Sequence, residues 1–150
     1  MNEQQNKRHV PRGRSWSRRY AMQALYQWQM TGQDLGQIDA QFLADQDMDK
    51  ADEAYFHELL HQVLARVDHI NHLLAPCLDR PLEQLDPVER AILWIAGYEL
   101  CFRRDVPYRV VINEAVELAK RFGAEQGHRF VNGVLDKMAR RVRPELGGGQ

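Results

Sequence analysis

The 150-residue sequence has only two cysteines, Cys77 and Cys101, which stand far apart in the chain. Neither belongs to a pattern typical of a metal cluster or a redox pair, so both are predicted to be free thiols in a reducing compartment. No apolar run approaches the length of a membrane span, and the N-terminus lacks the hydrophobic core of a secretory signal. These absences argue against a disulfide-rich, membrane or exported protein and predict a cytoplasmic one.

The sequence also lacks any long alternation of apolar and polar residues, which is the pattern of a half-buried strand. Apolar residues instead recur three and four positions apart, as on one face of a helix. The expected helices, the third with a break near Asp68, cover about 15–31, 38–43, 52–75, 86–103, 107–122 and 130–138. The fourth has a well-marked start, because Asp86 suits the N-cap, Pro87 the first turn and Glu89 the third position. The fold is therefore predicted to be all-α, a compact bundle of six to seven helices.

The length fits a single domain with a real core. Residues 1–14 are polar, basic and interrupted by Pro11 and Gly13, and we expect them to form a flexible basic arm. The helical domain is predicted to cover residues 15–143, and the glycine-rich residues 144–150 to be a disordered tail.

The formal net charge is only −1, so the overall charge does not indicate a partner. The distribution of charge is more informative. Residues 1–20 carry six basic residues against one acidic residue, whereas residues 34–58 carry eight acidic residues against Lys50 alone. A flexible arginine-rich arm that leads into an arginine-bearing helix can neutralise several phosphates of a nucleic acid. The alternative is a solvated tail without a partner.

One motif of an enzyme occurs. The segment from His57 to His61 matches the H-E-x-x-H pattern, in which two histidines one turn apart bind zinc and the glutamate activates water. The helical spacing places these residues opposite the apolar face, and a third ligand could come from Glu83 or Glu89 only through an unsupported fold. No nucleophile with an adjacent base and no glycine-rich phosphate loop is evident. We therefore predict a solvated helix face, no metal, no cofactor and no enzymatic activity.

Several short motifs occur in a fixed order between about residues 14 and 138. They are Ala24-Leu25-Tyr26-Gln27-Trp28-Gln29, Glu89-Arg90-Ala91-Ile92-Leu93, Val106-Pro107-Tyr108, Ile112-Asn113-Glu114-Ala115, Glu117-Leu118-Ala119-Lys120, Phe122-Gly123 and Phe130-Val131-Asn132-Gly133-Val134-Leu135-Asp136. This set resembles the NusB family of bacterial transcription antitermination factors.

The resemblance implies a fold of two packed three-helix subdomains. It also implies a protein that pairs with the small-subunit ribosomal protein acting as NusE and binds the single-stranded boxA element of ribosomal RNA transcripts. The complex would join other Nus factors on RNA polymerase, so that ribosomal RNA operons are transcribed without premature termination. The sequence leaves open whether the free chain forms a homodimer.

Candidate site residues follow from the resemblance and from charge. The resemblance implies five residues near the RNA or near the partner protein: Arg14, Arg18, Tyr26, Glu89 and Phe130. Charge alone adds four more residues to the RNA-binding set: Arg12, Arg19, Lys120 and Arg129. Tyr26 and Phe130 also suit buried positions, so their exposure decides their role. Trp16 could stack on a base. A basic ribosomal protein favours an acidic patch, for which we propose Glu83, Asp86 and Glu89.

A third interpretation keeps the fold and changes the function. The same helical domain resembles the RNA-binding portion of certain ribosomal RNA methyltransferases. No catalytic domain follows in this chain, so we expect a stand-alone factor.

Overall fold

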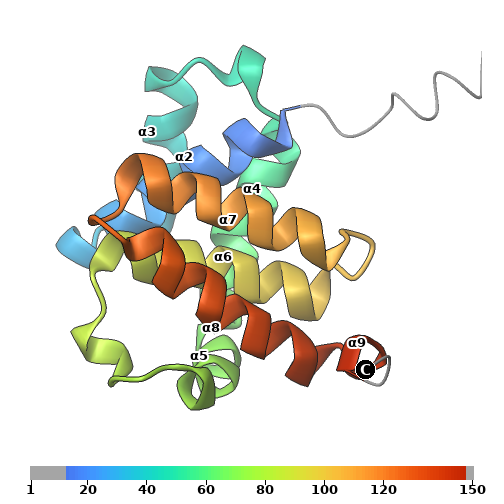
Figure 1. Cartoon of the computed structure of the whole chain (residues 1–150). Helices are drawn as coiled ribbons and strands as arrows, with labels where there is room; N and C mark the ends of the chain where they lie inside the picture. Colours follow the sequence, from blue (N-terminus) through green and yellow to red (C-terminus); the bar gives the residue numbers. More distant parts are fainter. Residues whose placement is uncertain (1–12, 148–150) are drawn as a thin grey trace, which may run out of the picture.

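The computed structural model describes residues 13–147, and within them it contains eight α-helices, three short 3-10 helices and no strand (Figure 1). The prediction of an all-α bundle is confirmed. Arg12, one of the predicted RNA-binding residues, lies outside the described residues. Between residues 13 and 147, no helix combines the length and the apolar character that crossing a bilayer requires.

The N-terminal half consists of three helices, α2 (Arg14–Thr31), α3 (Leu35–Asp45) and α4 (Glu53–Ala65), with the 3-10 helix η1 (Met48–Lys50) before α4. The side chain of Asp34 caps α3 and that of Asp52 caps α4, each accepting a backbone N–H bond. The predicted break of the third helix occurs at Arg66, which separates α4 from α5 (Val67–Leu74).

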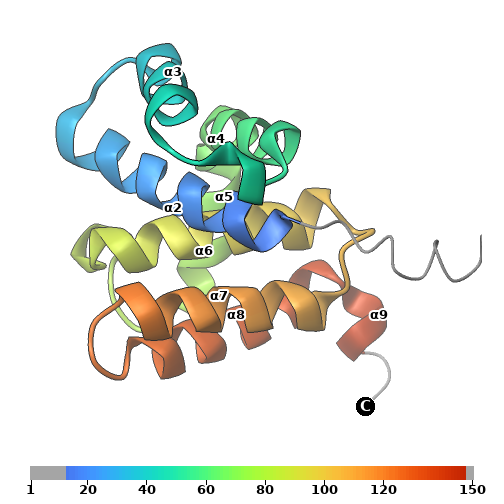
Figure 2. The same cartoon turned by 90° about the horizontal axis from the view of Figure 1, so that it is seen from above.

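The C-terminal half is built around α6 (Pro87–Phe102), α7 (Tyr108–Phe122) and α8 (Gly127–Val142), and the 3-10 helices η2 (Ala75–Cys77) and η3 (Leu82–Gln84) precede it. Asp86 accepts hydrogen bonds from the N–H groups of Val88 and Glu89, which confirms the predicted N-cap. Every residue from 91 to 100 is buried. Figure 2 shows the reason, since α6 runs between α2 and α4 on one side and α7 and α8 on the other. The two halves therefore share α6 as their common core helix.

Residues 144–147, the described part of the predicted tail, differ from the sequence prediction. Residues 144–147 are not disordered but form a one-turn helix, α9 (Pro144–Gly147). Arg143 explains this order, because its buried guanidinium donates hydrogen bonds to the carbonyls of Glu99, Leu100 and Val106 at 2.9–3.1 Å. Leu100 lies in the last turn of α6, where helix carbonyls lack partners within the helix, and Val106 lies just beyond it. Arg143 thus fastens the segment after α8 to the central helix.

Gly13 fixes the point at which the N-terminal segment meets the bundle. Its φ is +85°, in the left-handed region, and its carbonyl accepts hydrogen bonds from the N–H groups of Ser17 (2.8 Å) and Asp52 (3.3 Å). A Cβ on Gly13 would lie 2.7 Å from Asp52 N and 2.8 Å from the carbonyl carbon of Ala51. Glycine is therefore needed here both for its backbone conformation and for the close approach of two chain segments.

We predict that Gly13→Ala destabilises the protein by about 2–4 kcal/mol, because it adds a backbone collision to the cost of a left-handed residue. Gly32→Ala is the matched control, since Gly32 also has a positive φ of +66° but no atom within 4 Å of its Cβ position. That control should cost only about 1–2 kcal/mol. Urea unfolding followed by circular dichroism measures both, and equal losses would contradict the close contact at Gly13.

Candidate nucleic-acid interface

A basic and aromatic surface lies where the first turns of α2 run beside the second half of α7. It surrounds a hollow of about 340 Å³ lined by Ser15, Trp16, Arg19, Glu114, Glu117, Leu118 and Arg121. Lys50 reaches this surface from η1, and Lys120 lies at its edge, where its Nζ is 3.6 Å from Glu117 Oε2. We call Trp16, Arg19, Lys50, Lys120, Arg121 and Phe122 the α2–α7 surface.

Cations and rings alternate on the α2–α7 surface. The guanidinium of Arg19 lies 4.2 Å from the centre of the Trp16 ring and 5.2 Å from that of Phe122, and Lys50 Nζ lies 4.9 Å from Trp16. Cation–π contacts hold these long side chains over the rings while leaving their charge near the solvent. Such an arrangement offers phosphate-binding charges next to flat surfaces on which bases can stack.

The acidic residues of the hollow do not cancel this charge. Glu114 is already engaged within the protein, since it accepts a hydrogen bond from Ser15 Oγ at 3.0 Å and lies 3.3 Å from Arg18 Nη1. Glu117 is exposed and faces Lys120. The surface therefore carries four cations, from Arg19, Lys50, Lys120 and Arg121, and the exposed carboxylate of Glu117 pairs with only one of them. This balance favours an anionic partner.

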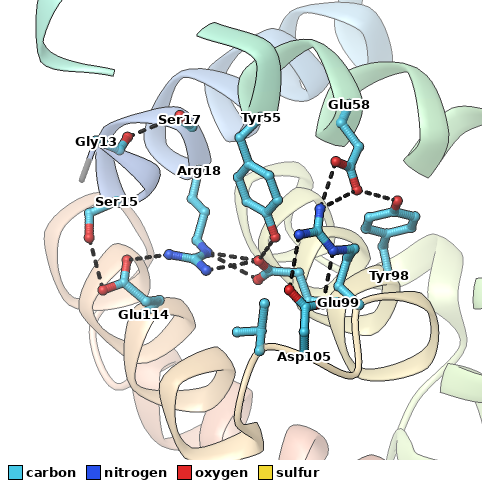
Figure 3. A network of polar contacts seen from close by, with 12 residues as sticks. Gly13, Ser15, Ser17, Arg18, Tyr55, Glu58, Tyr98, Glu99, Asp105 and Glu114 are labelled. Carbon is cyan, nitrogen blue, oxygen red and sulfur yellow. Dashed lines mark hydrogen bonds and ion pairs between the residues drawn. The ribbon is translucent and has the colours of Figure 1, made fainter. Parts of the chain in front are cut away.

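Arg18 is not part of this surface, which corrects the sequence prediction. Its side chain is buried, with only 4% of the residue exposed, and it points into the bundle (Figure 3). Arg18 Nε donates to both carboxylate oxygens of Glu99 at 3.0 Å, and Nη2 lies 2.9 Å from Glu99 Oε2. A guanidinium that is committed to a buried bidentate ion pair cannot bind a phosphate at the surface.

The buried pair belongs to a wider polar network. Tyr55 of α4 donates a short hydrogen bond from its hydroxyl to Glu99 of α6. Burial raises the pKa of Tyr55, and the negative charge of Glu99 raises it further. Burial alone would lower the pKa of Arg18, but the attraction of Glu99 outweighs it and raises that pKa. Both groups therefore keep their protons, and Glu99 is held by two donors from different helices.

Arg14 and Tyr26 occupy intermediate positions. Arg14 is the first residue of α2 and is half-buried, with its guanidinium 4.1 Å from the centre of the Tyr55 ring. It follows Gly13, the first residue that the structure describes. Tyr26 is 39% exposed and stands two helical turns after Arg19, on the same face of α2. The ring of Tyr26 is therefore accessible, which answers the question that the sequence left open.

Arg129 and Phe130 lie elsewhere, at the start of α8 beside the loop that follows η2. Phe130 is half-buried, and the guanidinium of Arg80 covers its ring at 4.4 Å from the centre. Arg129 and Phe130 line a small hollow of about 160 Å³ together with Cys77, Asp79, Gly133, Val134 and Lys137. We call Asp79, Arg80, Arg129, Phe130 and Lys137 the α8 patch. The structure thus divides the predicted RNA-binding residues between two places.

The predicted acidic patch is also divided. Glu83 and Asp86 are exposed, but Glu89 is buried, with 6% exposure, and is not available to a partner. Its carboxylate accepts a hydrogen bond from the N–H of Ala124 and packs against Gly127, the first residue of α8. Glu89 therefore joins α6 to the start of α8.

The H-E-x-x-H residues form the predicted solvated face only in part, because His57 is exposed but Glu58 and His61 are half-buried. Glu58 is half-buried and binds Arg103 Nη1 at 2.7 and 2.8 Å, and Tyr98 donates to it at 2.6 Å. His57 and His61 instead turn toward Asp39 of α3. The glutamate and the histidines thus belong to different contacts. The general base of a metalloprotease is not positioned here.

Sequence reasoning overlooked Lys50 and Arg121 on the α2–α7 surface. Arg121 follows Lys120 at the end of α7, and this pair of adjacent cations was a usable signal. Lys50 stands in an acidic stretch, and only the folding of η1 against the start of α2 brings it to Trp16. No local pattern predicts that contact.

The fold and this surface define a helical binding protein. A family model described as the NusB family matches residues 15–140. The chain is 55% identical over 134 residues to the transcription antitermination protein NusB of Alcanivorax borkumensis, and the match covers 89% of both proteins. The chain belongs to the NusB family, which confirms the resemblance seen in its motifs. Because the family consists of antitermination factors and not of enzymes, the prediction of a non-enzymatic protein is also confirmed.

Solved structures agree with this assignment. NusB of T. maritima superposes with a TM-score of 0.76 at 28% identity, over 91% of this chain and 96% of that one. A crystal structure of the antitermination factors NusB and NusE in complex with dsRNA matches with a TM-score of 0.75 at 24% identity, over 85% of this chain and 96% of that one. The match to this complex shows that the two chains share one fold.

We predict that Arg18→Met lowers the free energy of unfolding by about 3–5 kcal/mol, because it leaves Glu99 charged and unpaired in the core. Adding Glu99→Gln should recover a large part of this loss, since the buried charge is then removed. Arg19→Met is the matched control and should cost less than about 1 kcal/mol at its more exposed position. Urea unfolding at neutral pH measures all three variants. Equal losses of stability in Arg18→Met and Arg19→Met would contradict the prediction that breaking the buried Arg18–Glu99 pair destabilises the fold.

Glu89 predicts a dependence of stability on pH. Burial raises the pKa of Glu89, and the charge of Asp86 raises it further, while the hydrogen bond from Ala124 offsets part of the shift. Because the folded state then binds the proton more tightly than the unfolded state, Glu89 makes its full contribution to the free energy of unfolding at low pH. This contribution is lost as pH rises through the raised pKa. Urea unfolding at about pH 4 and pH 7 should therefore show Glu89→Gln gaining stability relative to the natural chain at the higher pH. Parallel pH profiles would contradict this strain on the carboxylate.

Proposed function

We propose that this chain is a transcription antitermination factor that binds the single-stranded boxA element of ribosomal RNA transcripts together with the ribosomal protein acting as NusE. In this role it joins other Nus factors on RNA polymerase in the cytoplasm and helps the polymerase resist premature termination. The observation that carries the proposal is the family match over residues 15–140, with relatives more than half identical that are themselves antitermination proteins.

The α2–α7 surface supports RNA binding at the level of chemistry. It combines the exposed cations Lys50, Lys120 and Arg121 and the half-buried Arg19 with the ring of Trp16, and it lies at the start of α2, which the basic N-terminal residues precede in the sequence. Arg14 lies at the start of α2, Tyr26 extends the same face of this helix, and Arg12, which precedes the described residues, is proposed as a further phosphate contact. Phosphates of a single strand would contact the cations, and bases would stack on the aromatic rings.

The α8 patch and its acidic neighbours are proposed for the protein partner. Phe130 beneath Arg80 supplies an aromatic anchor of the kind found at the centre of protein interfaces. Glu83 and Asp86, exposed on the nearby segment before α6, would attract a basic ribosomal protein. Arg129 is exposed beside Phe130, and we keep for it the role of an RNA phosphate contact next to the partner. The complex of NusB and NusE with dsRNA shares this fold and makes a joint RNA-binding assembly a reasonable model.

We expect Arg19→Ala to weaken binding of a fluorescent boxA RNA about five- to tenfold and to reduce the salt dependence by about one phosphate contact. Arg140→Ala is the matched control, because Arg140 is an exposed arginine outside the α2–α7 surface. It lies on α8 and pairs there with Asp136. Fluorescence anisotropy at two salt concentrations, with and without the NusE ribosomal protein, measures both variants. Addition of the partner should tighten binding.

Two competitors make the assay specific. A scrambled single strand of the same composition tests sequence preference, and a duplex of the boxA sequence tests preference for single strands. Equal binding of all three RNAs would contradict boxA recognition. If neither RNA binding nor partner binding were detected, the chain would be a helical interaction module of another kind.

A further inference from the structure

Three side chains from two helices meet at one point on the N-terminal half. His57 Nδ1 and His61 Nε2, one turn apart on α4, each lie 2.7 Å from the same atom, Asp39 Oδ2 of α3. The two imidazole rings are stacked, with their centres 4.0 Å apart. All three potential ligand atoms lie within 4.8 Å of one another. None of these residues belongs to the α2–α7 surface or to the α8 patch.

The environment of Asp39 is unusual for a carboxylate. The residue is buried, with 7% exposure, and its second oxygen, Oδ1, is buried without a hydrogen-bond partner among the described residues. A buried carboxylate whose oxygen lacks a partner is costly, because it has lost its water without full compensation. A cation bound by Asp39 and the two histidines would place positive charge beside this buried carboxylate and so offset part of the cost of burying it.

We propose that Asp39, His57 and His61 form a binding site for a divalent transition metal of the zinc class. Two imidazole nitrogens and one carboxylate oxygen are a ligand set that zinc accepts, and three protein ligands leave a fourth position for water. There is room for this water, because Asp39 and His57 line a surface hollow of about 490 Å³ together with Leu43, Glu53 and Ala54. The inference does not depend on the proposed role in antitermination.

The geometry requires only small movements. In a tetrahedral zinc site the ligand atoms stand about 3.3 Å apart, because the bonds are about 2.0–2.1 Å long. The nitrogen–oxygen separations of 2.7 Å must therefore open by about 0.6 Å to admit the ion. In each neutral imidazole the hydrogen that now faces Asp39 moves to the other ring nitrogen, so that the lone pair of the ligating nitrogen becomes available. Two hydrogen bonds are thereby replaced by three coordinate bonds.

The site would be structural and not catalytic. In a zinc protease the glutamate of the motif activates the metal-bound water, but here Glu58 is held by Arg103 and Tyr98. The ion would instead fasten α3 to α4. Asp39 is the buried ligand on α3, and both histidines lie in the middle of α4. A bound metal would therefore add a direct link between two helices that already pack through Phe42 and Phe56.

Cobalt and zinc titrations of the untagged full-length chain test the site. We expect one ion per chain, a visible Co²⁺ absorption spectrum of the tetrahedral type that Zn²⁺ displaces, and a rise in melting temperature of about 5 °C at saturating zinc. His61→Gln and Asp39→Asn should each weaken binding at least about tenfold, because each removes one of three ligands. His72→Gln is the matched control, since His72 is exposed on α5 away from the site.

The outcomes separate cleanly. Loss of the cobalt spectrum and of the thermal shift in His61→Gln, but not in His72→Gln, would establish the site even if Asp39→Asn failed to fold. Binding that is weakened equally by His61→Gln and His72→Gln would reveal scattered histidine binding and overturn the proposal. So would a chain whose melting temperature and spectrum do not respond to either metal.

Discussion

The buried ion pair between Arg18 and Glu99 is the constraint on which the two halves of this protein depend. Arg18 comes from α2 and Glu99 from α6, and both lie in the core at 4% and 1% exposure. A charge buried at this depth is tolerated only when its hydrogen-bonding groups are matched, and Tyr55 of α4 supplies the additional donor. Any shift of α2 against α6 would leave a charge unpaired, so the pair fixes how these helices meet.

That constraint also sets the outer surface. Successive helix residues are rotated by about 100°, so that fixing Arg18 inward turns Arg19 away from the core. Trp16 and Arg19 then lie together beside α7, where Phe122 and Arg121 extend the same surface. Glu114 connects the core to the outer surface, because its carboxylate pairs with the buried Arg18 and accepts a hydrogen bond from Ser15 at the edge of the hollow. The core therefore holds the helical part of the basic surface, and the segment of η1 adds only Lys50.

The sequence predicts the helices well and the roles of individual charges poorly. Apolar spacing and the caps at Asp52 and Asp86 are local signals, and they place most of the helices. Arg18 and Arg19 are identical in type and adjacent, and only the position of Glu99, far along the chain, decides which is buried. Glu89 looks like a capping-box residue, but the packing of α8 onto α6 turns it toward Ala124 and Gly127. Such pairings arise from tertiary contacts that no local pattern encodes.

The segment from His57 to His61 shows the same principle within a single turn of helix. In sequence it is one motif, and a zinc protease would use its three polar residues together. In this fold, α4 packs between α3 and α6, so Glu58 meets Arg103 and Tyr98 at the end of α6, whereas the histidines meet Asp39 on α3. The glutamate that would make the site catalytic is thereby used to hold the helices together. The residues of a motif can act together only where the surrounding helices let them face the same point. Here the two histidines face Asp39 as a set of metal ligands, and the glutamate that would act as general base faces elsewhere.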